Sequence, residues 1–421
     1  MALDYIEIKG GRRLEGEVQI SGAKNAALPA LATALLTSKK CVLQNVPDLQ
    51  DISTMLKILE HFGARSQSFD STYEIQIENL GSVEAPYDFV RKMRASVLLL
   101  GPLLARNGMA RISLPGGCAI GVRPIDLHLK AMESMGAVIS LQDGYVEARA
   151  KKLKGGEFTF GQVTVTGTIN SMMAASLADG ESRFLNCAKE PEVIFCGELL
   201  KSMGAKIEGL GTPTILVKGQ TSLSGFSHKL IPDRIESGTY MVAAAMTKGE
   251  VLIRQTCPQY LEAVIRALKD SGANVELQSQ DDILVKGANE ICPLNIVTQP
   301  HPGFPTDMQA QFMTYLCLAN GESQMMETIF ENRFMHVPEL MRLGAKITIQ
   351  GSKATIKGNA SLVGAPVMAT DLRASASLVL AGLVAKGTTK VHRIYHLDRG
   401  YEKMEKKLAL LGANIQRVPQ A

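Results

Sequence analysis

The stretch LEAVIRALKDSGANVEL, residues 261–277, contains the pattern that decides the fold. Its apolar residues recur at intervals of three and four, which places them on one face of a helix. The residues of this face are Leu261, Val264, Ile265 and Leu268. Gly272 follows, and glycine readily takes the left-handed conformation that ends a helix.

The same helix ending occurs six times along the chain. A glycine-alanine pair closes an amphipathic run at Gly63-Ala64, Gly136-Ala137, Gly204-Ala205, Gly272-Ala273, Gly344-Ala345 and Gly412-Ala413. Successive glycines are 73, 68, 68, 72 and 68 residues apart. A period this regular indicates six copies of one structural repeat.

Each repeat is predicted to run helix, strand, helix, strand, strand. The earlier helix is rich in alanine and serine, as at residues 171–178, 240–246 and 375–385. A strand such as residues 251–253 joins the two helices. Two short alternating segments follow five of the glycine-alanine pairs, and a turn separates them, which is typical of a hairpin.

The sixth repeat is incomplete, since only nine residues follow Gly412. We expect strands at residues 5–8 and 17–20 to supply the missing partners, so that the chain closes on itself. The prediction is an α/β protein with two three-repeat domains, residues 22–229 and residues 1–21 plus 230–421. A cleft between them is the expected ligand site. A solenoid is the alternative, but solenoid repeats are shorter and have capping ends.

Composition excludes several classes of protein. The 421 residues carry a net charge of only +4, and basic residues form no run longer than a pair, so nucleic-acid binding is not expected. The longest apolar stretch, residues 95–105, is too short to span a bilayer, and residues 1–10 lack a signal-peptide core. The seven scattered cysteines favour reduced thiols in a cytoplasm over disulfides or a zinc site.

Two glycine-containing segments carry unusual polar residues. In residues 21–27 a glycine turn precedes Lys24 and Asn25 at a helix start, which suits an anion, although a surface helix cap is the commoner meaning of such a segment. In the glycine- and proline-rich loop of residues 114–124, Cys118 lies five residues before Arg123, and a nearby cation favours a reactive thiolate. The other six cysteines are expected to be small core residues.

Further charged residues lie at turn-like positions. Asp307 follows Pro305 and Thr306, and taken alone it is best explained as an ordinary helix-start aspartate. The remaining members of this set are Arg94, Arg333, Arg373 and Arg399, with Asp371 beside Arg373. Together with Lys24 and Arg123 they would form a cationic site for a ligand that bears both phosphate and carboxylate.

The motifs around these residues resemble those of the UDP-N-acetylglucosamine enolpyruvyl transferases, which begin bacterial peptidoglycan synthesis. The matching segments are Ser-Gly-Ala-Lys24-Asn25, Arg94-Ala-Ser, Pro-Gly-Gly-Cys118, Gly-Val-Arg123-Pro, Pro-Asp233-Arg234-Ile-Glu236, Phe-Pro-Thr-Asp307, Glu-Asn-Arg333-Phe-Met-His336 and Asp371-Leu-Arg373. The similarity covers essentially the whole chain. The family fold, two inside-out α/β domains of three repeats each, agrees with the repeat count.

The resemblance implies an addition–elimination reaction without metal or redox cofactor. The 3-hydroxyl of UDP-N-acetylglucosamine attacks C2 of phosphoenolpyruvate while C3 is protonated, and the resulting ketal loses a proton and phosphate. Cys118 matches the family's proton donor and the attachment point of fosfomycin, and it lies on an expected mobile lid. Asp307 matches the base, and Lys24, Arg123 and Arg399 match the clamp on phosphoenolpyruvate.

The resemblance also implies a set of substrate-binding positions and no obligate protein partner. Those matching the nucleotide-sugar contacts are Asn25, Arg94, Pro124, Ile125, Asp126, Leu127 and Ile329, and those lining the cleft are Arg333, Asp371 and Arg373. One departure is the segment Gln162-Val163-Thr164-Val165-Thr166, where many members read Lys-Val-Ser-Val-Gly. We expect this segment to be a strand whose backbone N–H groups replace the lysine in binding diphosphate.

Two alternatives to this function stay open at the level of sequence. The related transferase that uses shikimate 3-phosphate shares fold and chemistry but lacks the Pro-Gly-Gly-Cys loop. A non-catalytic nucleotide-sugar sensor is the second alternative. It has no need of Lys24, Cys118, Asp307 and Arg399 together.

Overall fold

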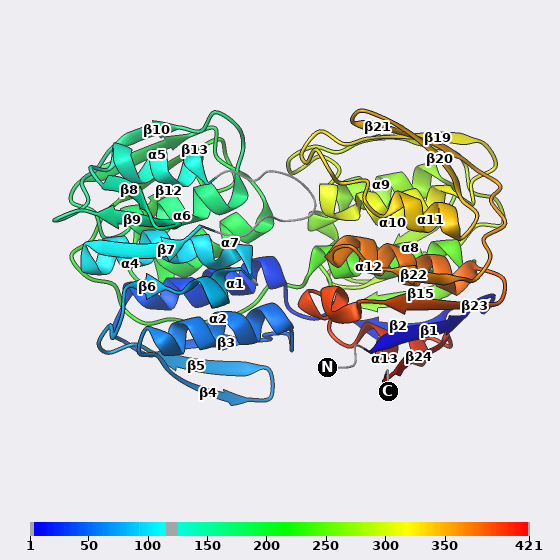
Figure 1. Cartoon of the computed structure of the whole chain (residues 1–421), viewed down its shortest axis with the longest axis horizontal. Coiled ribbons are helices and arrows are strands. Elements are labelled where there is room, and N and C mark those ends of the chain that lie inside the picture. The colour runs from blue at the N-terminus through cyan, green and yellow to red at the C-terminus, as the bar shows by residue number, and fades with distance from the viewer. Residues whose placement is uncertain (1–3, 92, 115–124, 420–421) are drawn as a thin grey trace. The chain divides into compact units, whose positions relative to one another are not determined.

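The computed structural model describes residues 4–91, 93–114 and 125–419. These residues form two compact units, a first unit of residues 22–231 and a second unit of residues 4–21 and 232–419. The described chain passes from one unit to the other after residue 21 and again after residue 231 (Figure 1). Each unit is described by itself below.

The first unit contains three four-stranded sheets among its described residues. In spatial order they are β14 (Ser227–Lys229), β3 (Cys41–Gln44), β5 (Thr72–Gln76) and β4 (Arg65–Phe69); β6 (Glu84–Ala85), β7 (Met109–Ser113), β9 (Tyr145–Arg149) and β8 (Val138–Gln142); and β10 (Glu157–Thr159), β11 (Glu181–Leu185), β13 (Thr214–Lys218) and β12 (Lys206–Glu208).

The second unit has the same number of four-stranded sheets in its described part. They are β16 (Asn274–Leu277), β17 (Ile283–Lys286), β15 (Glu250–Arg254) and β2 (Glu15–Gln19); β18 (Asn295–Val297), β19 (Glu322–Met326), β21 (Lys353–Lys357) and β20 (Lys346–Gln350); and β22 (Pro366–Met368), β23 (Thr388–His392), β1 (Tyr5–Lys9) and β24 (Asn414–Val418).

All six sheets follow one pattern, which confirms the repeat predicted from the glycine spacing. A short edge strand runs parallel to the next strand, as β10 does with β11, and two antiparallel pairings complete the sheet, as β11–β13 and β13–β12 do. The predicted hairpin strands after five of the glycine-alanine pairs are all present.

The N-terminal strands complete the second unit, but only one of them joins the sixth repeat. β1 lies between β23 and β24, antiparallel to both. β2 instead pairs in parallel with β15 in the sheet of the fourth repeat, so the expectation that residues 17–20 belong to the sixth repeat is wrong. The physical reason is that every sheet has a parallel edge strand. No repeat of the second unit precedes the fourth along the chain, so β2 supplies the edge strand of that sheet.

Helices form the interior of each unit. The helices of the first unit are α1 (Lys24–Thr33), η1 (Ala34–Leu36), α2 (Gln50–His61), α3 (Tyr87–Val90), η2 (Arg94–Leu99), α4 (Leu100–Asn107), α5 (Asp126–Ser134), α6 (Val165–Ala175) and α7 (Pro191–Ser202). Those of the second are α8 (Arg234–Met246), η3 (Pro258–Tyr260), α9 (Glu262–Asp270), η4 (Thr306–Met308), α10 (Gln309–Leu316), α11 (Val337–Arg342), α12 (Leu372–Val384), η5 (Ile394–Arg399) and α13 (Met404–Leu410).

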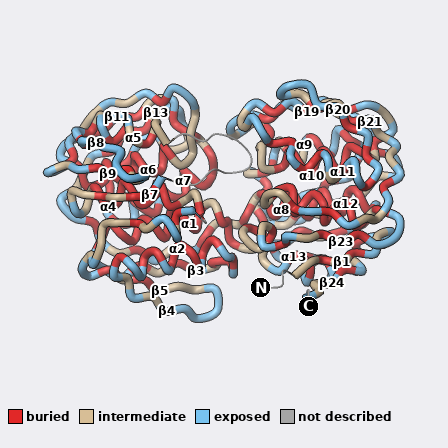
Figure 2. Tube along the Cα trace, in the orientation of Figure 1, coloured by how far each residue is buried: buried red, intermediate tan, exposed pale blue. Residues whose placement is uncertain are grey.

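The most buried helices are those that begin the repeats. In the second unit α8, α10 and α12 pack against one another, and every residue of α10 is buried (Figure 2). Because these helices are covered on all sides, they carry apolar and small or uncharged polar residues around the whole circumference rather than one apolar stripe, and alanine and serine are frequent in α8 and α12. The arrangement confirms the inside-out α/β architecture. None of the helices in the described ranges has the length and apolar character that crossing a bilayer requires.

These inner helices begin earlier than the composition predicts. α6 starts at Val165, α8 at Arg234 and α12 at Leu372. The reason is side-chain capping: the Asp233 carboxylate accepts the N–H groups of Ile235 and Glu236 at 2.8 and 3.0 Å, and Asp371 caps α12 in the same way.

The cysteine prediction is partly wrong. Cys41, Cys187, Cys196 and Cys317 are buried, as expected for small core residues. Cys257 is only half-buried, and Cys292 is exposed in the segment between β17 and β18. Ile291 is buried, whereas the side chain of Cys292 beside it faces solvent. Apolar neighbours in the sequence therefore did not indicate that Cys292 itself is buried.

Each glycine of the six pairs ends its helix in the predicted left-handed conformation. The φ angles of these glycines lie between +88° and +104°. In each pair the alanine N–H donates to the carbonyl five residues earlier, as Ala64 does to Leu59 at 2.9 Å and Ala273 to Leu268 at 3.0 Å. The glycine N–H donates to the carbonyl three residues earlier, which together makes a Schellman ending.

We predict that Gly204→Ala destabilises the protein by about 1–2 kcal/mol, because an L-residue in this conformation is strained. Gly204 has φ +104° and nothing within 4 Å of an added Cβ, so backbone strain is the only cost. Gly161→Ala is the matched control, since its site is equally open without positive φ. Urea unfolding of both variants tests this, and equal stabilities would contradict it.

Candidate active site

Asp307 is held by two arginines in the second unit. It lies in η4 at the start of α10, and its two carboxylate oxygens receive different partners. Arg333 Nη2 donates to Oδ1 at 2.6 Å, and Arg373 Nη2 donates to Oδ2 at 2.8 Å. Three residues that the sequence analysis selected separately therefore form one charged cluster.

The cluster presents its carboxylate outward and its cations inward. The Asp307 side chain is 25% exposed, whereas those of Arg333 and Arg373 are 4% and 6% exposed. Burial alone would lower the pKa of Arg373, but the charge of Asp307 and its hydrogen bond raise that pKa well above its ordinary value. A carboxylate oxygen has two acceptor positions, so one bond from an arginine does not use both of them.

A layer of neutral polar groups lies beside this cluster. The Gln311 amide donates to the Asp307 carbonyl at 3.0 Å and to the Tyr401 hydroxyl at 3.2 Å, and Arg373 lies 5.5 Å from the centre of the Tyr401 ring. All of these side chains are buried except that of Asp307. The layer fixes the direction of the buried guanidinium without adding charge.

Lys24 is the charged centre of the first unit. It opens α1 and is buried, and its Nζ lies 2.6 Å from Asp51 Oδ2 on α2. The Asp51 side chain is itself only 4% exposed. Moving the ammonium away from Asp51 would leave an uncompensated buried charge, which is costly. The ion pair therefore fixes the position of the Lys24 ammonium. Sequence reasoning missed Asp51, because it has the appearance of an ordinary first-turn aspartate.

The segment around Gln162 is not a strand, which corrects the prediction. Residues 162–164 form neither strand nor helix, and α6 begins at Val165 with Thr164 as its side-chain cap, accepting the Gly167 N–H at 3.2 Å. The backbone N–H groups of the first helical turn therefore point along the helix axis rather than sideways as in a strand.

A buried histidine supports this helix start. Asn170 is oriented by accepting the Gly101 N–H at 2.9 Å and donating to the Val97 carbonyl at 3.0 Å. Its amide therefore donates to His128 Nδ1 at 3.1 Å, so His128 Nε2 carries the proton and donates to Thr166 Oγ1 at 3.3 Å. Burial, followed by the charge of Arg94, lowers the pKa of His128 to about 4.

The remaining predicted residues take the following places. In the first unit Asn25 is the second residue of α1, Arg94 opens η2, and Ile125, Asp126 and Leu127 lie at the start of α5. In the second unit Ile329 follows β19, Asp371 caps α12 and Arg399 ends η5. Cys118, Arg123 and Pro124 lie outside the described residues.

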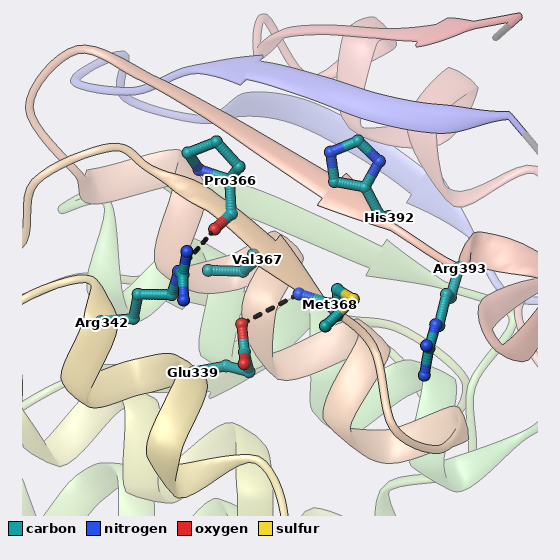
Figure 3. A pocket seen from close by; sticks show the side chains of 7 residues that line it. All are labelled: Glu339, Arg342, Pro366, Val367, Met368, His392 and Arg393. Atoms are coloured by element: carbon teal, nitrogen blue, oxygen red, sulfur yellow. Dashed lines mark hydrogen bonds between the residues drawn. The ribbon is translucent and has the colours of Figure 1, made fainter.

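A cavity of about 340 Å³ in the second unit is separate from these residues. It is lined by Glu339, Arg342, Pro366, Val367, Met368, His392 and Arg393. Glu339 accepts the Met368 N–H at 2.9 Å and Arg342 donates to the Pro366 carbonyl at 3.0 Å (Figure 3). The two α11 side chains thus occupy the free backbone groups of edge strand β22, which protects that edge from pairing with another chain.

Within the described residues no group of three or more histidine, cysteine or acidic side chains is arranged to hold a metal ion.

Comparison with known proteins gives full-length matches. The sequence matches the family described as EPSP synthase (3-phosphoshikimate 1-carboxyvinyltransferase) over residues 8–408. A protein of Desulfatibacillum aliphaticivorans named UDP-N-acetylglucosamine 1-carboxyvinyltransferase is 54% identical over 416 residues, covering 99% of this chain and 100% of its own length. The protein of the same name from Desulfosudis oleivorans is 55% identical, with the same coverage.

Solved structures agree with the fold. The enolpyruvyl transferase NikO from Streptomyces tendae superimposes with a TM-score of 0.90 at 25% identity, covering 100% of both chains. EPSP synthase from Acinetobacter baumannii superimposes with a TM-score of 0.77 at 17% identity, covering 99% of this chain and 100% of its own, and shows the fold alone.

The buried histidines predict a loss of stability in acid. Burial lowers the pKa of both His128 and His336 to about 4 from 6.5. Between these values the unfolded chain binds protons that the folded chain does not, so the free energy of unfolding falls as pH decreases from 6.5 to 4, by at most about 1.4 kcal/mol per pH unit for each histidine.

Urea unfolding at pH 7 and pH 5 tests this for wild type and His128→Gln, whose amide retains a donor and an acceptor. We expect wild type to lose more stability than the variant over this interval. An equal loss in both proteins would show that His128 does not contribute.

Proposed function

The chain belongs to the EPSP synthase family, and from this premise we propose that it transfers the carboxyvinyl group of phosphoenolpyruvate to the 3-hydroxyl of UDP-N-acetylglucosamine, releasing phosphate. The full-length relatives at 54–55% identity, which are named for that activity, support this choice of acceptor over shikimate 3-phosphate. The observation that carries the catalytic assignment is the partly exposed Asp307 carboxylate with hydrogen bonds from two buried arginines.

The reaction requires a base, an acid and a cationic environment. The sugar oxygen forms a bond to C2 of phosphoenolpyruvate while its proton goes to a base and a proton from an acid bonds to C3. In the second stage a C3–H bond and the C2–O bond to phosphate break, which restores the double bond and releases inorganic phosphate. Charge develops on the phosphate oxygens, so fixed cations stabilise the transition state.

Asp307 is the proposed base for the sugar hydroxyl. Two charge-assisted hydrogen bonds from Arg333 and Arg373 hold the carboxylate in one orientation, which removes the cost of orienting it during reaction. This geometry supports a positioned base better than an ordinary helix-start aspartate.

The other roles follow the resemblance of motifs. Lys24, Arg123 and Arg399 are the proposed contacts to phosphoenolpyruvate, and the Lys24–Asp51 pair supports this by fixing the ammonium. Cys118 is the proposed proton donor. Asn25, Arg94, Pro124, Ile125, Asp126, Leu127 and Ile329 are the proposed nucleotide-sugar positions, with Asp371 supporting Arg373.

We further propose that the enzyme acts in the cytoplasm, at the first committed step of peptidoglycan synthesis. The six described cysteines are free thiols, which supports a reducing compartment. The substrates are small molecules.

Phosphate release from phosphoenolpyruvate tests the acceptor. We expect release with UDP-N-acetylglucosamine and none with shikimate 3-phosphate. Release only with shikimate 3-phosphate would move the chain to the sister activity. Tight binding of the nucleotide sugar without any release would favour a sensor.

Asp307→Asn should lower the rate of phosphate release by about 10²–10⁴-fold, the usual contribution of a general base. The asparagine keeps one acceptor for an arginine, so the fold should survive. Asp282→Asn is the control, because Asp282 accepts a backbone N–H from Gln255 at the surface of the same unit. A fully active Asp307→Asn enzyme would remove Asp307 from the mechanism.

A further inference from the structure

One residue of the second unit departs from a pattern that four of the six repeats share. In four of the six repeats the residue directly after the strand that follows the inner helix has positive φ, between +54° and +59°. These residues are Asn45, Asn186, Gln255 and Arg393. The corresponding residues of the second and fifth repeats, Leu114 and Glu327, are both described and do not adopt this conformation.

Glu327 is a buried carboxylate that accepts four hydrogen bonds. It is 3% exposed and directly follows β19. Its Oε1 accepts the backbone N–H groups of Ile329 and Phe330 at 2.8 and 3.1 Å and the Thr298 hydroxyl at 3.0 Å. Its Oε2 accepts the Thr306 hydroxyl at 2.8 Å.

These bonds join two segments that carry the charged cluster. Thr306 directly precedes Asp307, and Phe330 lies three residues before Arg333, in a turn without regular helix or strand hydrogen bonding. Each of the two oxygens of Glu327 holds one of the segments, since Oε1 takes the Ile329–Phe330 turn and Oε2 takes Thr306.

We propose that Glu327 is a positioning residue, which sets Asp307 and Arg333 at their separation by tying the Thr306 segment to the Ile329–Phe330 turn. The proposal rests on the proposed function, since it gives Glu327 a part in the reaction that Asp307 is assigned. The ion pair of Asp307 with Arg333 joins the same two segments, because Asp307 directly follows Thr306 and Arg333 lies three residues after Phe330.

A buried carboxylate suits this positioning role because one rigid group accepts hydrogen bonds from several buried N–H and O–H donors at once. Without it, the N–H groups of Ile329 and Phe330 and the hydroxyl of Thr306 lose their partner, and both turns can shift. A displacement of about 1 Å at reacting groups costs about 10²-fold in rate. Substrate affinity depends on many other contacts, so the loss should fall mainly on kcat.

The variants Glu327→Ala and Glu327→Gln test the proposal in the full-length enzyme. Glutamine keeps Oε1 as an acceptor for the turn, and its amide group can donate to the Thr306 hydroxyl. We expect Glu327→Ala to lower kcat by about 10²-fold with little change in KM for phosphoenolpyruvate. Glu327→Gln should recover activity to within about tenfold of wild type, because neutral hydrogen bonds are weaker than charged ones.

Thr306→Val provides a second, milder variant, because it removes only the bond to Oε2, and it should lower kcat by about tenfold. Glu339→Ala is the matched control. Glu339 also accepts a backbone N–H in the second unit, but at the β22 edge, and its loss should leave kcat unchanged.

Hydrogen exchange gives a readout that does not depend on turnover. In Glu327→Ala the amides of Ile329 and Phe330 should exchange faster than in wild type, and in Glu339→Ala they should not. Wild-type kcat in Glu327→Ala, or a fall equal to that of Glu339→Ala, would overturn the proposal. If Glu327→Ala does not fold, a wild-type kcat in Thr306→Val overturns it.

Absence of phosphate release by the wild-type enzyme would instead overturn the proposed function. In that case unchanged hydrogen exchange in Glu327→Ala would still overturn the proposal that Glu327 ties the two segments together.

Discussion

The whole structure depends on one backbone requirement, which is that a helix must stop and the chain must turn into a strand once in every repeat. Six glycines with φ between +88° and +104° meet it, and the alanine after each closes the ending with a hydrogen bond to the carbonyl five residues earlier. No other residue takes this conformation so readily. An antiparallel strand pair follows this ending in five repeats, and in the sixth β24 follows it and pairs with β1, so six sheets of one topology result.

Chemistry is concentrated where this repetition is broken. Most residues of the inner helices are buried, and in the described part of the chain the segments that begin α10 and α12 bring Asp307 and Arg373 together. The fifth repeat replaces a left-handed turn residue with Glu327, and the second replaces it with Leu114, directly before the segment that contains Cys118. A regular scaffold thus supplies rigid positions, and the departures supply the polar groups.

The sequence was sufficient to predict what repeats and what is local. Helix-ending glycines and hairpins could be predicted because each rests on a short-range pattern, and the place of β1 because the sixth repeat lacks a strand. The pairing of β2 with β15 could not, since alternation in a strand does not name its partner. Asp51 and Glu327 were missed for a similar reason, because each meets its partner only in the folded chain. Asp51 contacts Lys24 on another helix, and Glu327 contacts Thr306 at a separation of 21 residues. The segment around Gln162 was assigned to a strand because the capping by Thr164 was overlooked.

The most direct test of this account is mass spectrometry of the product formed from phosphoenolpyruvate and UDP-N-acetylglucosamine in deuterated water. Addition followed by elimination places a solvent-derived hydrogen on C3 and then removes one of three from that carbon. The account therefore predicts a carboxyvinyl ether of the nucleotide sugar with deuterium on its vinyl carbon. A product without deuterium would contradict the addition step, and absence of the ether would contradict the assignment of the acceptor.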